Sequence, residues 1–311
     1  MASNISGVKL FCNMQNIIEQ TPITADIFLN DYCNNKCPWC TYARYGERNG
    51  QFMSLEDFVI YSNILRNNGV KGFILTGGGE PTISRDFDAI TKYLESNGLT
   101  YGINTNFNVY KEISPKYLKV SLDGWDEDSY EAQRGVRRYK ETIDNIKRYL
   151  AFRNKEKTSV GIQMIATSVD DVDKFYNAHK DLDIDYMNLR PMESTLHKYY
   201  DSHNEKDVLN RLYELQRVDS RVVVNYKWNY LRTEFEKCYA HFAQIALNQR
   251  GEVIYCCHKP YEIIGHITDK DIWEKFTYAK TNMSMCDIPC RLSGPNKLYK
   301  DMLMAKDVEF I

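Results

Sequence analysis

The chain has 311 residues, of which 43% are apolar and 26% are charged, and its formal net charge is −2. This length allows one large domain or two smaller ones with a substantial core. The near-neutral charge gives no reason to expect nucleic acid or an anionic membrane as a partner. No run of 18 apolar residues and no amino-terminal signal pattern is present, so we expect a cytoplasmic protein without a membrane span.

Strand-like and helix-like segments alternate after a weakly periodic lead-in over residues 1–22. Helices are predicted between most strands, one opened by the capping sequence Ser54-Leu55-Glu56-Asp57 and another capped by Ser84. The predicted strands cover residues 25–29, 72–76, 101–104, 118–122, 160–165 and 184–189. Six βα-type units predict a parallel sheet with right-handed crossovers, and functional sites are expected at the carboxyl ends of its strands.

Three cysteines, Cys33, Cys37 and Cys40, form a CxxxCxxC pattern shortly after the first predicted strand. Thiolates are the usual protein ligands of iron–sulfur clusters, and a set of three leaves a fourth iron open to another ligand. The alternatives are structural zinc and reactive thiols; structural zinc prefers four closed ligands in paired sets, and no histidine lies nearby. Nine cysteines in a chain of this size without a signal peptide indicate reduced thiols rather than disulfides.

This loop, with Trp39 before its last cysteine, resembles the cluster loop of radical S-adenosylmethionine (SAM) enzymes, in which SAM chelates the fourth iron of a [4Fe–4S] cluster. Gly78-Gly79-Glu80-Pro81 follows the second strand and matches the family motif that receives the amino group of SAM. The alternative is a simple turn, because glycine permits unusual backbone angles. The resemblance implies an α/β fold, a partial (β/α)6 radical SAM barrel, which we assign to residues 23–220.

Further residues after later strands fit the same family pattern. The resemblance implies that Ser121 and Arg134 hold the carboxylate and ribose of SAM, and that Asn104, with Asn106, is placed to hydrogen-bond to it. An arginine suits a carboxylate because its guanidinium is planar and permanently charged. The alternatives are a turn or cap for Ser121, a surface charge for Arg134 and turn residues for the asparagines.

The remaining cysteines gather late in the chain, apart from Cys12, which we interpret as structural. Residues 222–226 are predicted to form a strand outside the βα rhythm, so we place a domain boundary at residue 220, and residues 246–255 are predicted to form a hairpin. The pattern Cys238-x12-Gly251-x4-Cys256 and the later pair Cys286 and Cys290 resemble the "twitch" auxiliary-cluster domain, a short SPASM-like form, of radical SAM enzymes. The resemblance implies a second [4Fe–4S] cluster on these four cysteines within residues 221–311, with a zinc site as the alternative.

Cys257 stands beside a predicted ligand. Three interpretations of Cys257 stay open: an inert thiol, a ligand in place of one of the four, or a catalytic donor of a hydrogen atom to a substrate radical. Free cysteines are usually inert.

The resemblance implies reductive cleavage of SAM and hydrogen-atom abstraction from a carbon of a substrate, with a flavodoxin- or ferredoxin-type electron donor as a partner. We expect epimerisation or dehydrogenation of a peptide or natural product. The alternatives are a sugar or aminocyclitol dehydrogenase and a non-catalytic electron-transfer protein. The first enzyme of molybdenum cofactor synthesis is disfavoured because the chain ends without a double-glycine tail.

Overall fold

The computed structural model describes residues 21–40, 42, 49–191, 205–225, 228, 237–257, 259–282 and 292–304. Most of the predicted lead-in and Cys12, Cys286 and Cys290 lie outside these residues.

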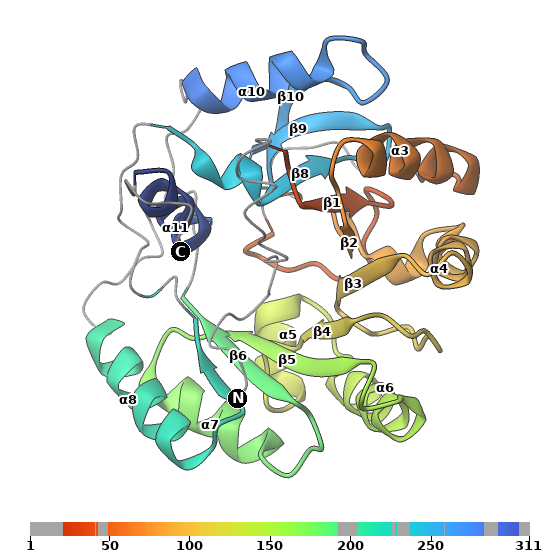
Figure 1. Ribbon diagram of the computed structural model, residues 1–311. Helices are drawn as coiled ribbons and strands as arrows, with labels where there is room; N and C mark the ends of the chain where they lie inside the picture. The colour runs from red at the N-terminus through yellow and green to blue at the C-terminus, as the bar shows by residue number, and fades with distance from the viewer. Residues whose placement is uncertain are drawn as a thin grey trace.

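One curved sheet of ten strands organises the described part of the chain (Figure 1). Its order is β10-β9-β8-β1-β2-β3-β4-β5-β6-β7. The strands β1 to β7 run parallel, β8 pairs parallel with β1, and β8, β9 and β10 pair antiparallel. The strands are β1 Thr24–Phe28, β2 Gly72–Thr76, β3 Thr100–Thr105, β4 Tyr117–Ser121, β5 Ser159–Ile165, β6 Tyr186–Arg190, β7 Val222–Val224, β8 Gln244–Leu247, β9 Glu252–Cys256 and β10 Lys259–His266. The predicted α/β class with a mainly parallel sheet is therefore confirmed.

Helices lie along the outside of this curve, with α3, α4 and α6 on one side and α7 and α8 below (Figure 1). The helices are α3 Leu55–Asn67, η1 Pro81–Ile83, α4 Phe87–Ser96, α5 Glu127–Arg134, α6 Tyr139–Phe152, α7 Val169–His179, α8 Glu205–Val218, η3 Tyr239–Phe242, α10 Ile272–Asn282 and α11 Ser293–Met304. Among the described residues, none of these helices has the length and apolar character needed to cross a membrane.

The two faces of the sheet differ in chemistry, because alternate residues of a strand point to opposite sides. The outer face is apolar and forms one core with the helices; it includes Ile27, Leu75, Ile103, Val120, Ile162 and Leu189. The intervening positions of the same strands are largely polar or glycine, and they include Asp26, Gly102, Asn104, Lys119, Gln163 and Asn188. The outer face thus packs against the helices and stabilises the sheet, and the inner face carries the polar side chains that a functional site needs.

The carboxy-terminal strands complete the same sheet as the βα units. Strand β7 was predicted outside the βα rhythm, and this is wrong, because β7 pairs parallel with β6 from Met187↔Val222 to Leu189↔Val224. The predicted hairpin is confirmed, but its first strand, β8, lies beside β1. The sheet therefore continues past the expected boundary at residue 220.

One local prediction also needs correction, and two connections are more irregular than the simple βα pattern. Ser84 does not cap α4; its hydroxyl donates to the carbonyl of Leu29, and the N-cap residue is Asp86. The helix predicted around Ile143, Ile146 and Leu150 is confirmed as α6, and a short helix, α5, precedes it and ends where Gly135 takes a left-handed φ of 69°. No helix lies between β3 and β4, where residues 106–116 form an irregular connection. The capping by Ser54 is confirmed, since its hydroxyl accepts the N–H of Asp57.

Candidate functional site

The loop after β2 holds the start of the cysteine loop through the backbone. The N–H of Gly79 donates to the carbonyl of Asn30 (3.0 Å), and the N–H of Glu80 donates to the carbonyl of Tyr32 (2.8 Å). The side chain of Asn30 returns a bond from Nδ2 to the carbonyl of Glu80 (2.7 Å). The glycine loop is therefore in direct contact with the residues that lead into the cysteine motif, at the carboxyl ends of β1 and β2.

Gly79 is required by this close approach. A Cβ atom at position 79 would lie 1.8 Å from the carbonyl oxygen of Tyr32 and 2.1 Å from Oδ1 of Asn30, which no side chain can do. A Cβ atom at Gly78 would lie 3.3 Å from its nearest neighbour, the carbonyl oxygen of Asn30. The two glycines thus have different roles, and only the second is required by a backbone contact.

The carboxylate of Glu80 lies beneath this loop and is 3% exposed. Oε1 accepts hydrogen bonds from the backbone and hydroxyl of Thr82 (3.0 and 2.6 Å) and from the hydroxyl of Thr105 (2.5 Å). Oε2 accepts the N–H of Asn106 (2.7 Å). Burial raises the pKa of Glu80, while these hydrogen bonds lower it. The hydrogen bonds that Glu80 accepts therefore connect the loop after β2 with the end of β3. Oε1 has three protein donors, whereas Oε2 has one.

The end of β3 supports the cysteine loop from a second side. Nδ2 of Asn106 donates to Oδ1 of Asn34 (2.7 Å) and lies 3.8 Å from Sγ of Cys33, and Nδ2 of Asn108 donates to Oδ1 of Asn35 (2.6 Å). Phe107 between them has a left-handed φ of 55°, which is strained for a bulky residue. Strain of this kind is typical of functional loops, since surrounding contacts must maintain it.

The carboxyl end of α5 supports the loop from a third side. Nε1 of Trp39 donates to Oε1 of Gln133 (2.7 Å), and the N–H of Lys36 donates to the carbonyl of Arg134 (2.9 Å). Nη1 of Arg134 lies 3.4 Å from Sγ of Cys37. The loop is thus held by residues that follow β2 and β3 and by the last turn of α5.

Arg134 is a buried cation with a buried partner. Its Nη2 lies 2.5 Å from Oδ2 of Asp123 and also donates to the carbonyl of Ser121. Burial alone would lower the pKa of Arg134, but the charges of Asp123 and Cys37 raise it, so the guanidinium stays charged. The surface-charge alternative for Arg134 is therefore wrong.

The carboxy-terminal cysteines approach the first loop from the edge of β8 and β9. Cys256 ends β9 and Cys238 precedes η3, and both are half-buried. Cys257 is 6% exposed, and its carbonyl accepts a bond from the hydroxyl of Tyr42 (3.1 Å), two residues after Cys40. The two predicted cysteine sites thus belong to neighbouring parts of one structure.

A known family model matches the part of the chain that contains the first loop. The radical SAM superfamily model matches residues 27–178, from β1 into α7. This chain carries a radical SAM domain. The domain is typical of enzymes, and its match covers both the cysteine loop and the glycine loop.

Relatives of this radical SAM domain catalyse different reactions. A probable GTP 3′,8-cyclase from Pyrobaculum aerophilum is 27% identical over 115 residues, 35% of this chain and 37% of that protein. An S-adenosyl-L-methionine-dependent tRNA 4-demethylwyosine synthase from Methanocaldococcus jannaschii is 29% identical over 143 residues, 42% of this chain and 45% of that protein. The chain thus matches less than half the length of either relative.

Solved structures share the fold over most of the chain. Streptococcus suis SuiB bound to its precursor peptide SuiA aligns with a TM-score of 0.64 and 18% identity, covering 93% of this chain and 74% of SuiB. The enzyme anSMEcpe with bound AdoMet and Cp18Cys peptide aligns with a TM-score of 0.62 and 17% identity, covering 92% of this chain and 86% of anSMEcpe. At these identities the likeness establishes the fold: a partial radical SAM barrel.

The radical SAM domain has the polar atoms that an absent cofactor would need. Within the described residues, Nδ2 of Asn35, Oδ1 of Asn104 and Nε of Arg134 are buried and have no hydrogen-bond partner. Burying such atoms without a partner costs free energy, so their position around the cysteine loop fits a polar ligand. The described side chains also form no single-ion metal site. A cluster binds each thiolate to a different iron, so its ligands need not converge as zinc ligands must.

A row of amides on the inner face was missed in the sequence. Nδ2 of Asn225 donates to Oδ1 of Asn188 (3.1 Å), and Nδ2 of Asn188 donates to Oε1 of Gln163 (3.2 Å), so the row crosses β7, β6 and β5. The signal was available, because Gln163 and Asn188 each stand between apolar residues of a strand and Asn225 directly follows the apolar strand β7. In isolation, however, a strand does not reveal which of its faces lies inside the barrel.

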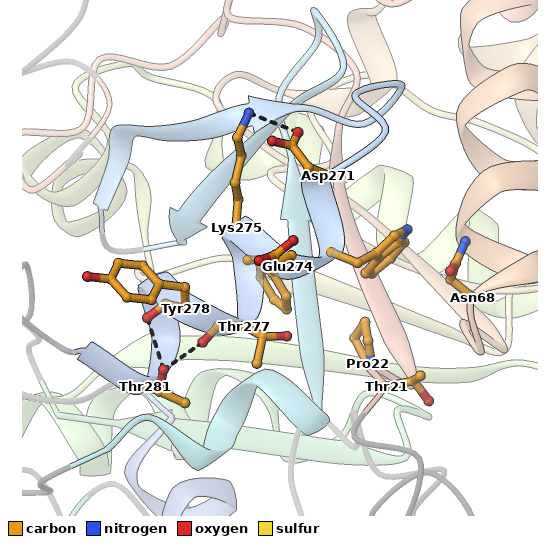
Figure 2. A pocket seen from close by; sticks show the side chains of 11 residues that line it. Thr21, Pro22, Asn68, Asp271, Glu274, Lys275, Thr277, Tyr278 and Thr281 are labelled. Atoms are coloured by element: carbon orange, nitrogen blue, oxygen red, sulfur yellow. Dashed lines mark hydrogen bonds and ion pairs between the residues drawn. The ribbon is translucent and has the colours of Figure 1, made fainter.

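The cavity in Figure 2 is separate from the cysteine and glycine loops. It has a volume of about 750 Å³ and lies between the outer side of α10 and the segment before β1, with Thr21, Asn68 and Lys275 among its lining residues. Thr21 precedes β1 and Asn68 precedes β2, so the cavity lies at the amino ends of strands whose carboxyl ends carry the cysteine and glycine loops. It is therefore not part of the candidate cofactor site.

Proposed function

We propose that this protein is a radical SAM enzyme that removes a hydrogen atom from a carbon of a peptide or natural-product substrate, giving epimerisation or dehydrogenation. The observation that carries this proposal is the contact of the cysteine loop with the glycine loop, Asn106 and Arg134 inside a radical SAM domain. A non-catalytic electron carrier would not need this second set of contacts around a cluster loop.

Each residue of the site has a proposed task. Cys33, Cys37 and Cys40 hold a [4Fe–4S] cluster, and the family resemblance assigns SAM to Gly78, Gly79, Glu80, Asn104, Ser121 and Arg134. When bound, the cluster and SAM supply the radical chemistry, which the side chains alone do not provide. Oε2 of Glu80 and the unpartnered atoms of Asn104 and Arg134 are polar groups of the described residues that could bind SAM.

A second cluster is proposed for Cys238 and Cys256, with Cys286 and Cys290 as the expected remaining ligands. The support is that Cys238 and Cys256 lie close to the same part of α10, since the N–H of Cys238 donates to the carbonyl of Lys280 (3.1 Å) and the side chain of Lys280 donates to the carbonyl of Tyr255. Cys257 remains a proposed hydrogen-atom donor, and a flavodoxin- or ferredoxin-type protein remains the proposed electron donor.

The peptide substrate is supported by the inner face and by two structural neighbours. Amides of Gln163, Asn188 and Asn225 offer both donors and acceptors, as a peptide backbone requires. SuiB and anSMEcpe, which share the fold, have structures with bound peptides. The second candidate is a polar small molecule such as a sugar or aminocyclitol, which the same amides would also suit.

The deciding experiment is SAM cleavage by anaerobically reconstituted protein with dithionite. We expect about eight irons per chain from two four-iron clusters and formation of 5′-deoxyadenosine. The Cys33→Ala/Cys37→Ala/Cys40→Ala variant is expected to hold about four irons and to form no 5′-deoxyadenosine. Cys238→Ala/Cys256→Ala is the matched control and is expected to keep the first cluster. If the triple variant still cleaved SAM, the proposal would be wrong.

A further inference from the structure

Lys280 is a buried lysine near the end of α10. Lys280 is 3% exposed, and its Nζ donates to the backbone carbonyl of Tyr255. Nζ also lies 4.5 Å from the ring centre of Tyr255 and 5.4 Å from that of Phe276, positions in which a cation contacts aromatic rings. These contacts hold the ammonium group in a defined place beside β9.

Among the described residues, no carboxylate balances the charge of Lys280. Within the described part of the chain, no Asp or Glu oxygen lies within 4.0 Å of Nζ, whereas Lys275, one turn earlier on α10, pairs with Asp271 at 2.9 Å. Burial of an uncompensated ammonium is costly, because a carbonyl and two rings replace water only in part. A buried lysine with this environment indicates an anion that binds nearby.

The candidate anion belongs to the cysteine-bearing segments that Lys280 contacts. Tyr255, whose carbonyl binds Nζ, directly precedes Cys256, and the carbonyl of Lys280 accepts the N–H of Cys238 (3.1 Å). His241 lies beside the same segment, since its Nδ1 contacts the carbonyl of Cys238. Lys280 therefore lies between the segments that carry the two described cysteines of the carboxy-terminal site.

We propose that Lys280 is the internal counter-cation of an anionic iron–sulfur cluster held by Cys238 and Cys256. This inference rests on the second cluster proposed above and assigns Lys280 a positioning role, not a catalytic one. A fixed positive charge stabilises the more negative, reduced cluster over the oxidised one and so raises its reduction potential. The reduction potential of the cluster then depends on a residue that is not one of its ligands.

The test compares three lysine variants in the full chain that also carries Cys33→Ala/Cys37→Ala/Cys40→Ala, so that only the second cluster is present. The redox titration is monitored by electron paramagnetic resonance. We expect Lys280→Met to lower the equilibrium constant for reduction about tenfold, which is about 59 mV for one electron. Lys280→Arg keeps the charge and is expected to stay near the parent. Lys275→Met is the control, because this exposed lysine is balanced by Asp271 (Figure 2).

A second measurement separates charge balance from simple packing. In iron-free protein the buried ammonium lacks its anion, so Lys280→Met is expected to leave the thermal midpoint unchanged or to raise it. A lower midpoint without a shift in potential would show that Lys280 only packs, and would overturn the inference. A parent that holds four irons with the same potential in all variants would overturn it as well. A parent that holds no iron would instead remove the second cluster itself, and the inference with it.

Discussion

The ion pair of Arg134 and Asp123 connects the cysteine loop to the end of β4. Its side chains are only 11% and 6% exposed, so removal of one partner leaves the other charge buried without compensation. Because Nη1 of Arg134 also contacts Cys37, the loss of this side chain reaches the proposed cluster ligands. At the scale of the residue, the guanidinium of Arg134 thus belongs to a buried salt bridge with Asp123 and also contacts a proposed cluster ligand, Cys37.

We expect Arg134→Met to lower the free energy of unfolding by about 3–5 kcal/mol. Arg134→Met/Asp123→Asn is the matched control and is expected to lose less. It removes both charges, and the amide oxygen introduced at position 123 can still accept the N–H of Ile165, as Oδ1 of Asp123 does. Both values come from denaturant unfolding of iron-free protein. Equal losses in the two variants would contradict this role for the ion pair.

His179 gives the fold a sensitivity to acid. It is 1% exposed, its Nδ1 lies 2.7 Å from the carbonyl of Phe175, and burial lowers its pKa to about 4 from an ordinary 6.5. Below about pH 6.5 the unfolded chain therefore binds a proton that the folded chain does not bind until about pH 4, so stability falls as the pH falls through this window. By linkage the loss is about 2 kcal/mol at pH 5.

This loss is measured as the difference in unfolding free energy between pH 7.5 and pH 5. His179→Gln removes the titrating group, so we expect the variant to lose about 2 kcal/mol less than the parent over the same interval. The variant is less stable at pH 7.5, because the contact with the carbonyl of Phe175 changes; only the pH dependence is diagnostic. Parallel pH profiles for the parent and the variant would be evidence against a buried neutral imidazole.

At the scale of the element, the glycine loop is where sequence and structure agree most closely. We expect Gly79→Ala to reduce the iron bound by Cys33, Cys37 and Cys40 by more than half, because the new methyl group would displace Tyr32 and with it the cysteine loop. Gly78→Ala is the control and is expected to keep most of the iron, since its methyl group comes no closer than 3.3 Å to its nearest neighbour, the carbonyl oxygen of Asn30. Iron is measured per folded chain after reconstitution. Similar losses in both variants would contradict the difference between the two glycines.

The strands were predictable because each carries its own signal. Apolar runs such as residues 72–76 and 118–122 mark β2 and β4, and loops after them carry the motifs. The neighbours of a strand carry no such local signal: nothing in Gln244–Leu247 indicates that β8 pairs with β1, over 200 residues away. The same limit applies to the site. Cys33 and Glu80 were identified from motifs, whereas the contacts of Gln133 with Trp39 and of Asn108 with Asn35 depend on how α5 and β3 pack.

At the scale of the whole molecule, β1 is an interior strand only because β8 covers it. Removal of residues 226–311 would leave the N–H and carbonyl groups of β1 unpaired along one edge and would remove Gln244, whose amide donates to the buried carboxylate of Asp26. Exposed edges of this kind promote aggregation. We therefore expect a chain that ends at residue 225 to be largely insoluble, whereas a chain that ends at residue 304 stays soluble. The soluble fraction and gel filtration measure this; a monomeric, cooperatively unfolding 1–225 fragment would show that β1 does not need β8.

The pairing of β1 with β8 also has a consequence for synthesis of the protein on the ribosome. The hydroxyl and N–H of Thr24 find their acceptor only when Ala243, 219 residues later in the chain, has been made. At a translation rate of about 5–20 residues per second, this delay lasts roughly 10–45 s. During that time β2 to β7 can assemble on one side of β1 while its other edge stays open. The nascent chain therefore passes through a stage in which the strand leading into the cysteine loop is the part most in need of a chaperone.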